Sequence, residues 1–217
     1  MVGLESQAHS TSVKPTTNSQ SFHRRTFITF ASLSLTHVGC VILALFVDSL
    51  FHQIEKEYVS LKKEVEESSK GGETEAQPSV ITELKFGSAW YVPGGKSTVA
   101  RLLADAGANY IFADNTNSGS VPLSFETVFD KGQDADFWLI KYNQPIDKTY
   151  TELASDYAPY KNFEAWKEQR IFGCNTNKVN FYEESPFHPE RLLKDLIKIF
   201  YPSLLPNYDL VYYSPLK

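Results

Sequence analysis

The sequence predicts a single three-layer α/β domain with a mainly parallel sheet, preceded by a long amphipathic helix and an N-terminal hydrophobic helix. Three observations lead to this fold class. From residue 78 to residue 217, short apolar segments alternate with amphipathic ones, as in strands that are connected by helices. Residues 48–67 carry one apolar stripe of helical period, and residues 26–47 contain no Asp, Glu, Lys or Arg.

The composition is that of an ordinary globular chain and excludes several functional classes. A formal charge of −5 over 217 residues argues against a nucleic-acid partner, which would need a basic surface. Two cysteines are too few for a disulfide-dense scaffold or a cysteine-cluster zinc site. Of the five histidines, only His188 lies after residue 77, so we expect no metal site and no resident cofactor in the domain.

The N-terminus is expected to carry a membrane or export segment. Residues 1–25 are rich in Ser, Thr, Gln and Asn and have a net charge of +2, so we predict a disordered basic segment. Residues 26–47 can span a bilayer as a helix, since about 20 apolar residues suffice. The basic residues just before them favour a periplasmic location for the rest of the chain. A cleaved signal is the alternative, and residues 24–28 also resemble a twin-arginine export signal.

Cys40 is a candidate for lipidation. The run Val38-Gly39-Cys40 resembles the end of a lipobox, although His37 stands where an aliphatic residue is usual. A plain membrane anchor with an incidental cysteine is the alternative reading.

Residues 48–77 are predicted to be a linking helix followed by a polar linker. About 20 helical residues would extend roughly 30 Å. The run SSKGGETEAQ contains Gly71 and Gly72 and is expected to end the helix. The apolar stripe of the helix consists of Leu50, Ile54, Tyr58, Leu61 and Val65.

Residues 78–217 are predicted to form the α/β domain. Ser97 and Ser124 are expected to begin helices, Gly107 to end one, and Pro189 to be the first residue of another. Strands or extended segments are expected at residues 79–86, 110–112, 136–142, 170–173, 178–182 and 209–213, and helices at 97–106, from 124, at 160–169 and from 189.

The run Gly94-Gly95-Lys96-Ser97-Thr98 looks like part of a phosphate-binding loop. The full pattern requires a glycine five residues before Gly95, where Trp90 stands, so we do not predict nucleotide binding. We interpret the two glycines as the approach to a helix N-terminus, where free N–H groups favour polar or anionic ligand atoms. No catalytic residue is predicted, and Cys174, which has no basic neighbour in the sequence, is expected to be a structural thiol.

Three loops that follow predicted strands supply the candidate ligand-binding residues. Ligands of parallel sheets bind at the carboxyl ends of strands, so we expect these loops to cluster there. The alternative for the first loop is that its aromatic side chains simply cover the edge of the sheet. The candidates are Trp90, Tyr91, Asn115, Asn117, Ser118 and Tyr142.

Three longer segments carry a family resemblance. They are SAWYVPGGKSTVARLLADAGANYIFAD, GSVPLSFETVFDKGQDADFW and HPERLLKDLIKIFYPSLLPNYDLVYY. Together they resemble class III substrate-binding proteins of ATP-binding cassette (ABC) importers, in particular members from Bacteroidetes-type bacteria. These proteins serve the uptake of iron–siderophores, haem and cobalamin.

The resemblance implies two α/β lobes joined by a rigid helix, with the ligand between them. Residues 78–217 would be the C-terminal ligand-binding lobe, and the N-terminal lobe has no counterpart, so we expect a truncated member. The loops at Trp90-Tyr91 and at residues 115–118 would face the ligand. Glu126 matches the glutamate that docks into an arginine pocket on the permease; the residues alone predict only a surface acid that is favoured by the helix dipole.

The predicted function is therefore the substrate-binding component of an ABC importer for iron–siderophore, haem or cobalamin-type ligands. Its expected partners are an ABC permease, an iron or cobalt chelate and the membrane, with no nucleic acid. It would lie on the periplasmic side of the inner membrane, anchored by residues 26–47 or exported after cleavage. The alternative is a membrane-anchored structural or interaction module that has lost ligand binding, and an enzyme is the weakest reading.

Overall fold

The computed structural model describes residues 47–69 and 77–217 of the chain. The predicted disordered segment, most of the hydrophobic segment at residues 26–47, Cys40 and most of the polar linker lie outside these residues. Residues 47–69 are helical, as expected from their apolar stripe. Among the described helices, none combines the length and apolar character that a bilayer span requires.

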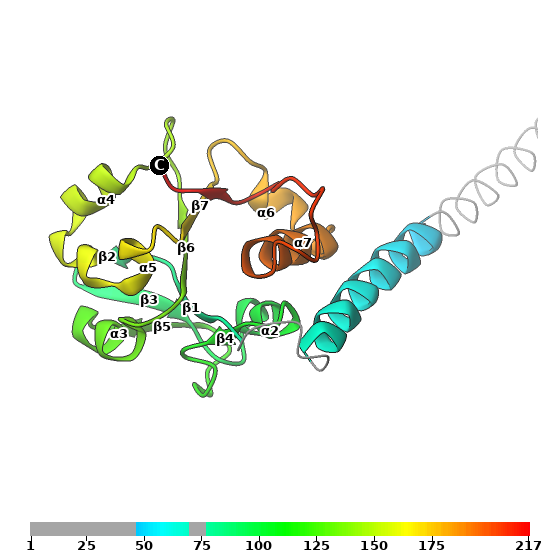
Figure 1. Ribbon diagram of the computed structural model, residues 1–217, viewed down its shortest axis with the longest axis horizontal. Coiled ribbons are helices and arrows are strands. Elements are labelled where there is room, and N and C mark those ends of the chain that lie inside the picture. Colours follow the sequence, from blue (N-terminus) through cyan, green and yellow to red (C-terminus); the bar gives the residue numbers. More distant parts are fainter. Residues whose placement is uncertain (1–46, 70–76) are drawn as a thin grey trace, which may run out of the picture. The chain divides into compact units, whose positions relative to one another are not determined.

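A five-stranded sheet forms the centre of the α/β domain and confirms the predicted fold class (Figure 1). Four of its strands are parallel and the last is antiparallel. Strand β6 is continuously apolar from Phe137 to Ile140 because parallel strands under helices are buried on both faces. In spatial order the strands are β4 (Asn109–Tyr110), β1 (Ser79–Thr82), β6 (Phe137–Tyr142), β7 (Ile171–Asn175) and β8 (Ser214–Pro215).

A second, three-stranded antiparallel sheet was not expected from the sequence. It contains β2 (Lys85–Phe86), β3 (Ala89–Pro93) and β5 (Ser120–Leu123), with β3 in the middle. In β3 the side chains alternate, so that Trp90 and Val92 are buried and Tyr91 is exposed.

Helices cover both faces of the five-stranded sheet. Figure 1 shows α2, α6 and α7 on one side, and α3, α4 and α5 with the small sheet on the other. Ser97 and Ser124 cap α2 and α3 as predicted, and α7 begins at Pro189. The helices are α2 (Thr98–Asp105), α3 (Phe125–Gly132), α4 (Tyr150–Asp156), the 3₁₀-helix η1 (Ala158–Asn162), α5 (Glu164–Lys167), α6 (Phe181–Glu184) and α7 (Pro189–Phe200).

Several predicted elements were wrong. The single helix expected at residues 160–169 is divided into η1 and α5, because Phe163 has extended backbone angles between them. The strand expected at 178–182 is replaced by α6, in which Phe181 packs on Tyr212. Residues 209–213 are not a strand; the backbone N–H groups of residues 211–213 bind the carboxylate of Asp195 instead.

Helix 47–69 packs on the domain through the later part of its apolar stripe. Leu61 and Val65 are buried, whereas Leu50 is exposed. The Tyr58 hydroxyl donates to Asp105 Oδ2 at 2.8 Å, and Lys62 forms an ion pair with the same carboxylate. These contacts fix the helix against the end of α2.

Candidate functional site

The carboxyl ends of β1, β6 and β7 lie side by side. Thr82 of β1 is in register with Leu139 of β6, and Tyr142 of β6 with Asn175 of β7. We call the three segments that follow these strands the carboxyl edge; they are residues 83–88, which include β2, residues 143–149, and residues 176–188, which include α6. In open parallel sheets this is the edge where ligands bind.

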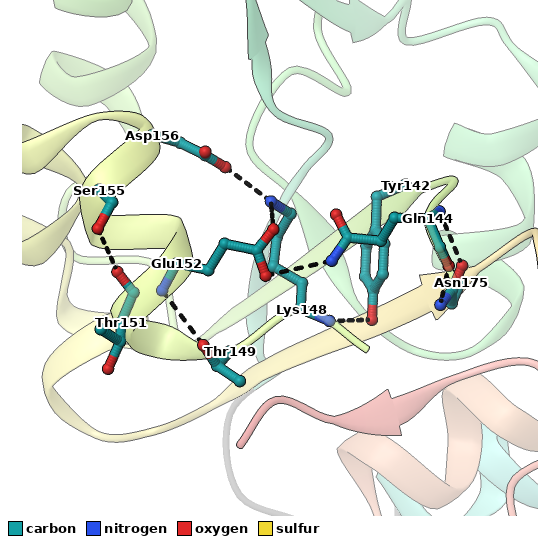
Figure 2. Close-up of polar contacts among 9 residues, drawn as sticks. All are labelled: Tyr142, Gln144, Lys148, Thr149, Thr151, Glu152, Ser155, Asp156 and Asn175. Carbon is teal, nitrogen blue, oxygen red and sulfur yellow. Dashed lines mark hydrogen bonds and ion pairs between the residues drawn. The ribbon is translucent and has the colours of Figure 1, made fainter. Parts of the chain in front are cut away.

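Asn175 joins two loops of the carboxyl edge through its side chain (Figure 2). Its Nδ2 donates to the Gln144 carbonyl at 2.9 Å, and its Oδ1 accepts from the Gln144 N–H at 3.3 Å. The same oxygen accepts from the Asn177 N–H at 3.2 Å. One buried side chain therefore holds the loops after β6 and β7 in a fixed relation.

Lys148 anchors the other end of the loop after β6. Its Nζ lies 2.7 Å from Asp156 Oδ2 and 3.3 Å from Glu152 Oε1, and its N–H donates to the Tyr142 hydroxyl at 3.1 Å (Figure 2). Burial favours the neutral amine, but the hydrogen bonds to Asp156 and Glu152 outweigh it and raise the pKa of Lys148. The loop is thus preorganised by a buried, fully charged lysine.

Large apolar side chains project from this ordered edge. Each of the three loops carries at least one, and they are far more exposed than apolar residues usually are. They are Phe86 (81% exposed), Ile146 (76%), Tyr182 (64%) and Phe187 (73%). Several highly exposed apolar side chains on the segments at one end of a parallel sheet make this end a candidate binding surface. The sequence analysis missed all four, although isolated apolar residues in the polar runs NQPIDK and SPFHP were a detectable signal.

Trp90, a predicted ligand contact, lies in the core. It has an exposed fraction of 0%, its ring stacks on Trp138 at 5.5 Å between centroids, and its indole N–H donates to the Thr82 carbonyl at 3.0 Å. Since its side chain cannot reach a ligand in this arrangement, we assign Trp90 to packing. Its neighbour Tyr91 points the other way and is 46% exposed.

The predicted loop at residues 115–118 meets the two-glycine turn. The Lys96 N–H donates to the Asn117 carbonyl at 3.0 Å, and the Gly94 N–H to the Gly119 carbonyl at 2.8 Å. A Cβ on Gly94 would lie 2.2 Å from the Asn117 oxygen, so a glycine is needed there. These amides are used inside the protein and are not free for a phosphate. Asn115 Oδ1 accepts from the Asn117 N–H at 2.9 Å and shapes the turn.

The expected cluster of all three loops is not found. Tyr110, Val80 and Phe137 are in register across β4, β1 and β6, and Tyr142 lies five residues beyond Phe137. At about 3.3 Å per residue, Tyr142 is about 16 Å farther along the sheet than Tyr110. The chain turns back directly after Tyr110, through the Ala113 N–H to Tyr110 carbonyl bond. Tyr142 therefore belongs to the carboxyl edge, and residues 115–118 form a separate polar surface.

Glu126 is exposed in the first turn of α3, which Ser124 caps. Its pKa is lowered, chiefly by its own backbone N–H and then by the Ser124 hydroxyl, and Lys85 of the carboxyl edge adds to the effect. Glu126 is therefore a charged surface acid close to Lys85.

The described residues contain no built metal site. Within residues 47–69 and 77–217 there is no group of three or more His, Cys, Asp or Glu that could hold an ion. Cys174 is fully buried, and burial raises the pKa of its thiol to about 12. Two open hollows of about 320 Å³ lie elsewhere, one beside Trp166 and one beside Asn109, and neither is lined by a predicted site residue.

Comparison with known proteins places the chain in a family. Residues 47–177 match the family described as periplasmic binding protein. An uncharacterized lipoprotein of Methanocaldococcus jannaschii is 28% identical over 128 residues, which cover 58% of this chain and 30% of that protein.

Solved structures share the fold. The TroA-like periplasmic binding protein FepB from Veillonella parvula has a TM-score of 0.54 and 16% identity, covering 76% of this chain and 56% of that one. The periplasmic heme-binding protein RhuT from Roseiflexus sp. RS-1 has a TM-score of 0.52 and 22% identity, and the match covers 71% of this chain and 55% of that one. A periplasmic heme-binding protein from Pseudomonas aeruginosa has a TM-score of 0.55 and 16% identity, and the match covers 72% of this chain and 53% of that one.

The chain spans about half the length of these solved structures. The family match covers more than half of the chain and includes helix 47–69, β3, Glu126 and the loop after β6. This chain belongs to the periplasmic binding protein family, whose members are transport binding proteins and not enzymes.

Proposed function

We propose that this chain acts as a substrate-binding component of an ABC importer and that its carboxyl edge contacts an iron–siderophore, haem or cobalamin-type ligand. The observation that carries the proposal is the high exposure of Phe86, Ile146, Tyr182 and Phe187 on the segments that follow β1, β6 and β7. Asn175 joins the segments after β6 and β7. Family membership and two haem-binding structural relatives support it.

Tyr142 is proposed as a ligand contact at the base of this edge. Tyr91, Asn117 and Ser118 are exposed and remain candidates for a second polar contact surface, which Asn115 shapes. The metal would arrive with the ligand as part of the chelate. A ligand touched from the carboxyl edge alone buries only one of its faces, so we expect dissociation constants in the micromolar range or weaker.

The test is a binding titration with haem, a ferric trihydroxamate and cobalamin as probes. Tyr182→Ser and Phe187→Ser should each weaken binding about tenfold, since each removes an aromatic contact of a few kcal/mol at most. Val59→Ser is the matched control, because Val59 is also exposed but lies on helix 47–69. Failure of all three probes to bind, or equal loss in the control, would overturn the proposal.

We further propose that the chain lies on the periplasmic side of the membrane, held by residues 26–47 or by a lipid on Cys40, and that Glu126 docks on the permease. The lipoprotein relative supports membrane attachment. A reporter fused after Lys217 should be active in the periplasm, and Cys40→Ser should release the chain from membranes only if lipid is the anchor. Cytoplasmic reporter activity would contradict this location.

A further inference from the structure

Glu83 is held in an unusual backbone conformation at the carboxyl end of β1. Its φ is 68°, in the left-handed region that non-glycine residues seldom adopt. Two hydrogen bonds fix it there: its N–H donates to the Leu139 carbonyl at 2.9 Å, and its carbonyl accepts from the Trp138 indole N–H at 2.8 Å. Backbone strain of this kind persists only where the surroundings enforce it, and it is common at binding sites.

This conformation directs the Glu83 carboxylate to Lys141, near the end of β6. The two side chains form an ion pair and are 21% and 18% exposed, so the pair is largely withdrawn from water but still reachable. Lys141 Nζ also lies 5.9 Å from the centre of the Phe181 ring, at the start of α6. The ammonium group therefore sits between a carboxylate and an aromatic ring, at the carboxyl edge.

A small cavity adjoins the same lysine. It has a volume of about 30 Å³ and is lined by Lys141, Thr82, Phe181 and apolar residues of α2 and α7. Thr82 Oγ1 is buried close to the Tyr110 hydroxyl, which donates to the Pro93 carbonyl at 2.7 Å. The space suffices for one water molecule or one small polar group. Lys141 therefore borders an unfilled space as well as packed atoms.

We propose that Lys141 selects ligands by charge: a carboxylate of the bound chelate takes the place of Glu83 as the partner of Lys141. The inference rests on the function proposed above. In the empty protein, Glu83 spares the cost of leaving a half-buried ammonium group without a counter-ion. An anionic ligand can supply the counter-ion itself and release Glu83 to water. A neutral ligand leaves the ion pair in place and gains nothing from it.

The test compares haem, which carries two propionate carboxylates, with haem dimethyl ester, in which both are neutral. Each is titrated into the purified chain and followed by absorbance. Wild type should prefer haem, and Lys141→Met should lower haem affinity about tenfold, which is the effect of one charge-assisted hydrogen bond, while ester affinity stays the same. Lys141→Arg should keep the preference, and Glu83→Gln should strengthen haem binding.

The control is Lys167→Met, which removes a lysine from an exposed ion pair with Glu164 on α5 and should change neither affinity. Three outcomes would overturn charge selection while the proposed function stands. Wild type could bind haem and its ester with equal affinity, or Lys141→Met could keep the preference of wild type for haem. The third is that the chain binds neutral cyanocobalamin but not haem. If the chain binds none of these probes and no ferric trihydroxamate, both charge selection by Lys141 and the proposed binding function are contradicted. If Lys141→Met does not fold, as judged by thermal unfolding, Glu83→Gln decides: no gain in haem affinity overturns the inference.

Discussion

Val65 of helix 47–69 packs directly against Gly107, the second residue after α2. A Cβ on Gly107 would lie 2.5 Å from Val65 Cγ1 and 3.1 Å from Tyr201 Cε2. Gly107 also has a φ of +76°, so it provides the left-handed turn that ends α2, as the sequence predicted. Gly107 therefore ends α2 and also leaves the space in which helix 47–69 packs.

Gly107→Ala should destabilise the fold by about 2–4 kcal/mol, since it adds a left-handed backbone penalty of about 1 kcal/mol to the cost of overpacking. Chemical denaturation measures the loss. Gly87→Ala is the matched control, because Gly87 has a φ of +59° but no atom within 4 Å of the added Cβ. Gly87→Ala should lose only the stability that corresponds to the left-handed backbone penalty. Equal losses of unfolding free energy in the two variants would mean that Val65 can shift without cost and that its contact with Gly107 is not closely packed.

Asp195→Ala should release residues 208–213, which follow α7, from their hydrogen bonds to the domain. The buried Asp195 carboxylate accepts from the Tyr208 hydroxyl at 2.8 Å and from the N–H groups of Val211, Tyr212 and Tyr213 at 2.9, 2.7 and 3.0 Å. Removing it leaves buried donors unpaired, and we expect a loss of about 3 kcal/mol or more.

Hydrogen exchange checks this prediction locally, because the amides of residues 211–213 should lose their protection. Asp114→Ala is the control: Asp114 forms an exposed ion pair with Lys131, and such pairs contribute little to stability. Amides that stay protected in Asp195→Ala would show that the segment is held by packing alone.

Cys174 should resist thiol reagents as long as the protein is folded. Burial raises the pKa of its thiol to about 12, above its ordinary value of 9.0, so almost no reactive thiolate forms at pH 8.5. In a Cys40→Ser background, labelling of the native chain should proceed no faster than unfolding and become rapid in urea. Val59→Cys, at an exposed site, should label at once in the native state. Immediate labelling of native Cys174 would contradict the burial argument.

Glu126→Ala should leave stability nearly unchanged, since an exposed acid in a first helical turn gains little from the helix dipole. If Glu126 docks on a permease, the same change should reduce co-purification with that permease, and Glu126→Lys should abolish it by charge repulsion. Glu164→Lys, an acid in the first turn of α5, serves as the control. Co-purification that survives Glu126→Lys would leave Glu126 as a surface acid only.

Local signals in the sequence were sufficient for several elements. Ser97 and Ser124 cap helices through their own side chains, and Pro189 begins α7, so these helix starts depend on neighbouring residues only. Trp90 was misassigned because its loop is in fact the central strand of an antiparallel sheet. The alternation along a strand then buries Trp90 and exposes Tyr91, which the sequence alone could have revealed only if the strand had been recognised.

The carboxyl edge depends on contacts that no local pattern contains. Glu83 and Lys141 are 58 residues apart, and they meet because β1 and β6 are neighbours in register. Helix α6 forms where a strand was predicted, because Phe181 packs on Tyr212 with ring centroids 5.6 Å apart. Exposed apolar residues such as Phe187 can be interpreted only after the strands around them are placed.

The anchoring of the last residues affects how the chain is made. Strand β8 pairs with β7, the Leu216 N–H donates to the Ile171 carbonyl at 2.9 Å, and the Tyr150 N–H donates to the Lys217 carbonyl at 2.8 Å. During synthesis on the ribosome, this edge of the sheet cannot close until residues 211–217 have emerged. Until then the side of β7 that faces away from β6 is an unpaired, largely apolar edge. Chaperones cover edges of this kind, and uncovered edges promote aggregation.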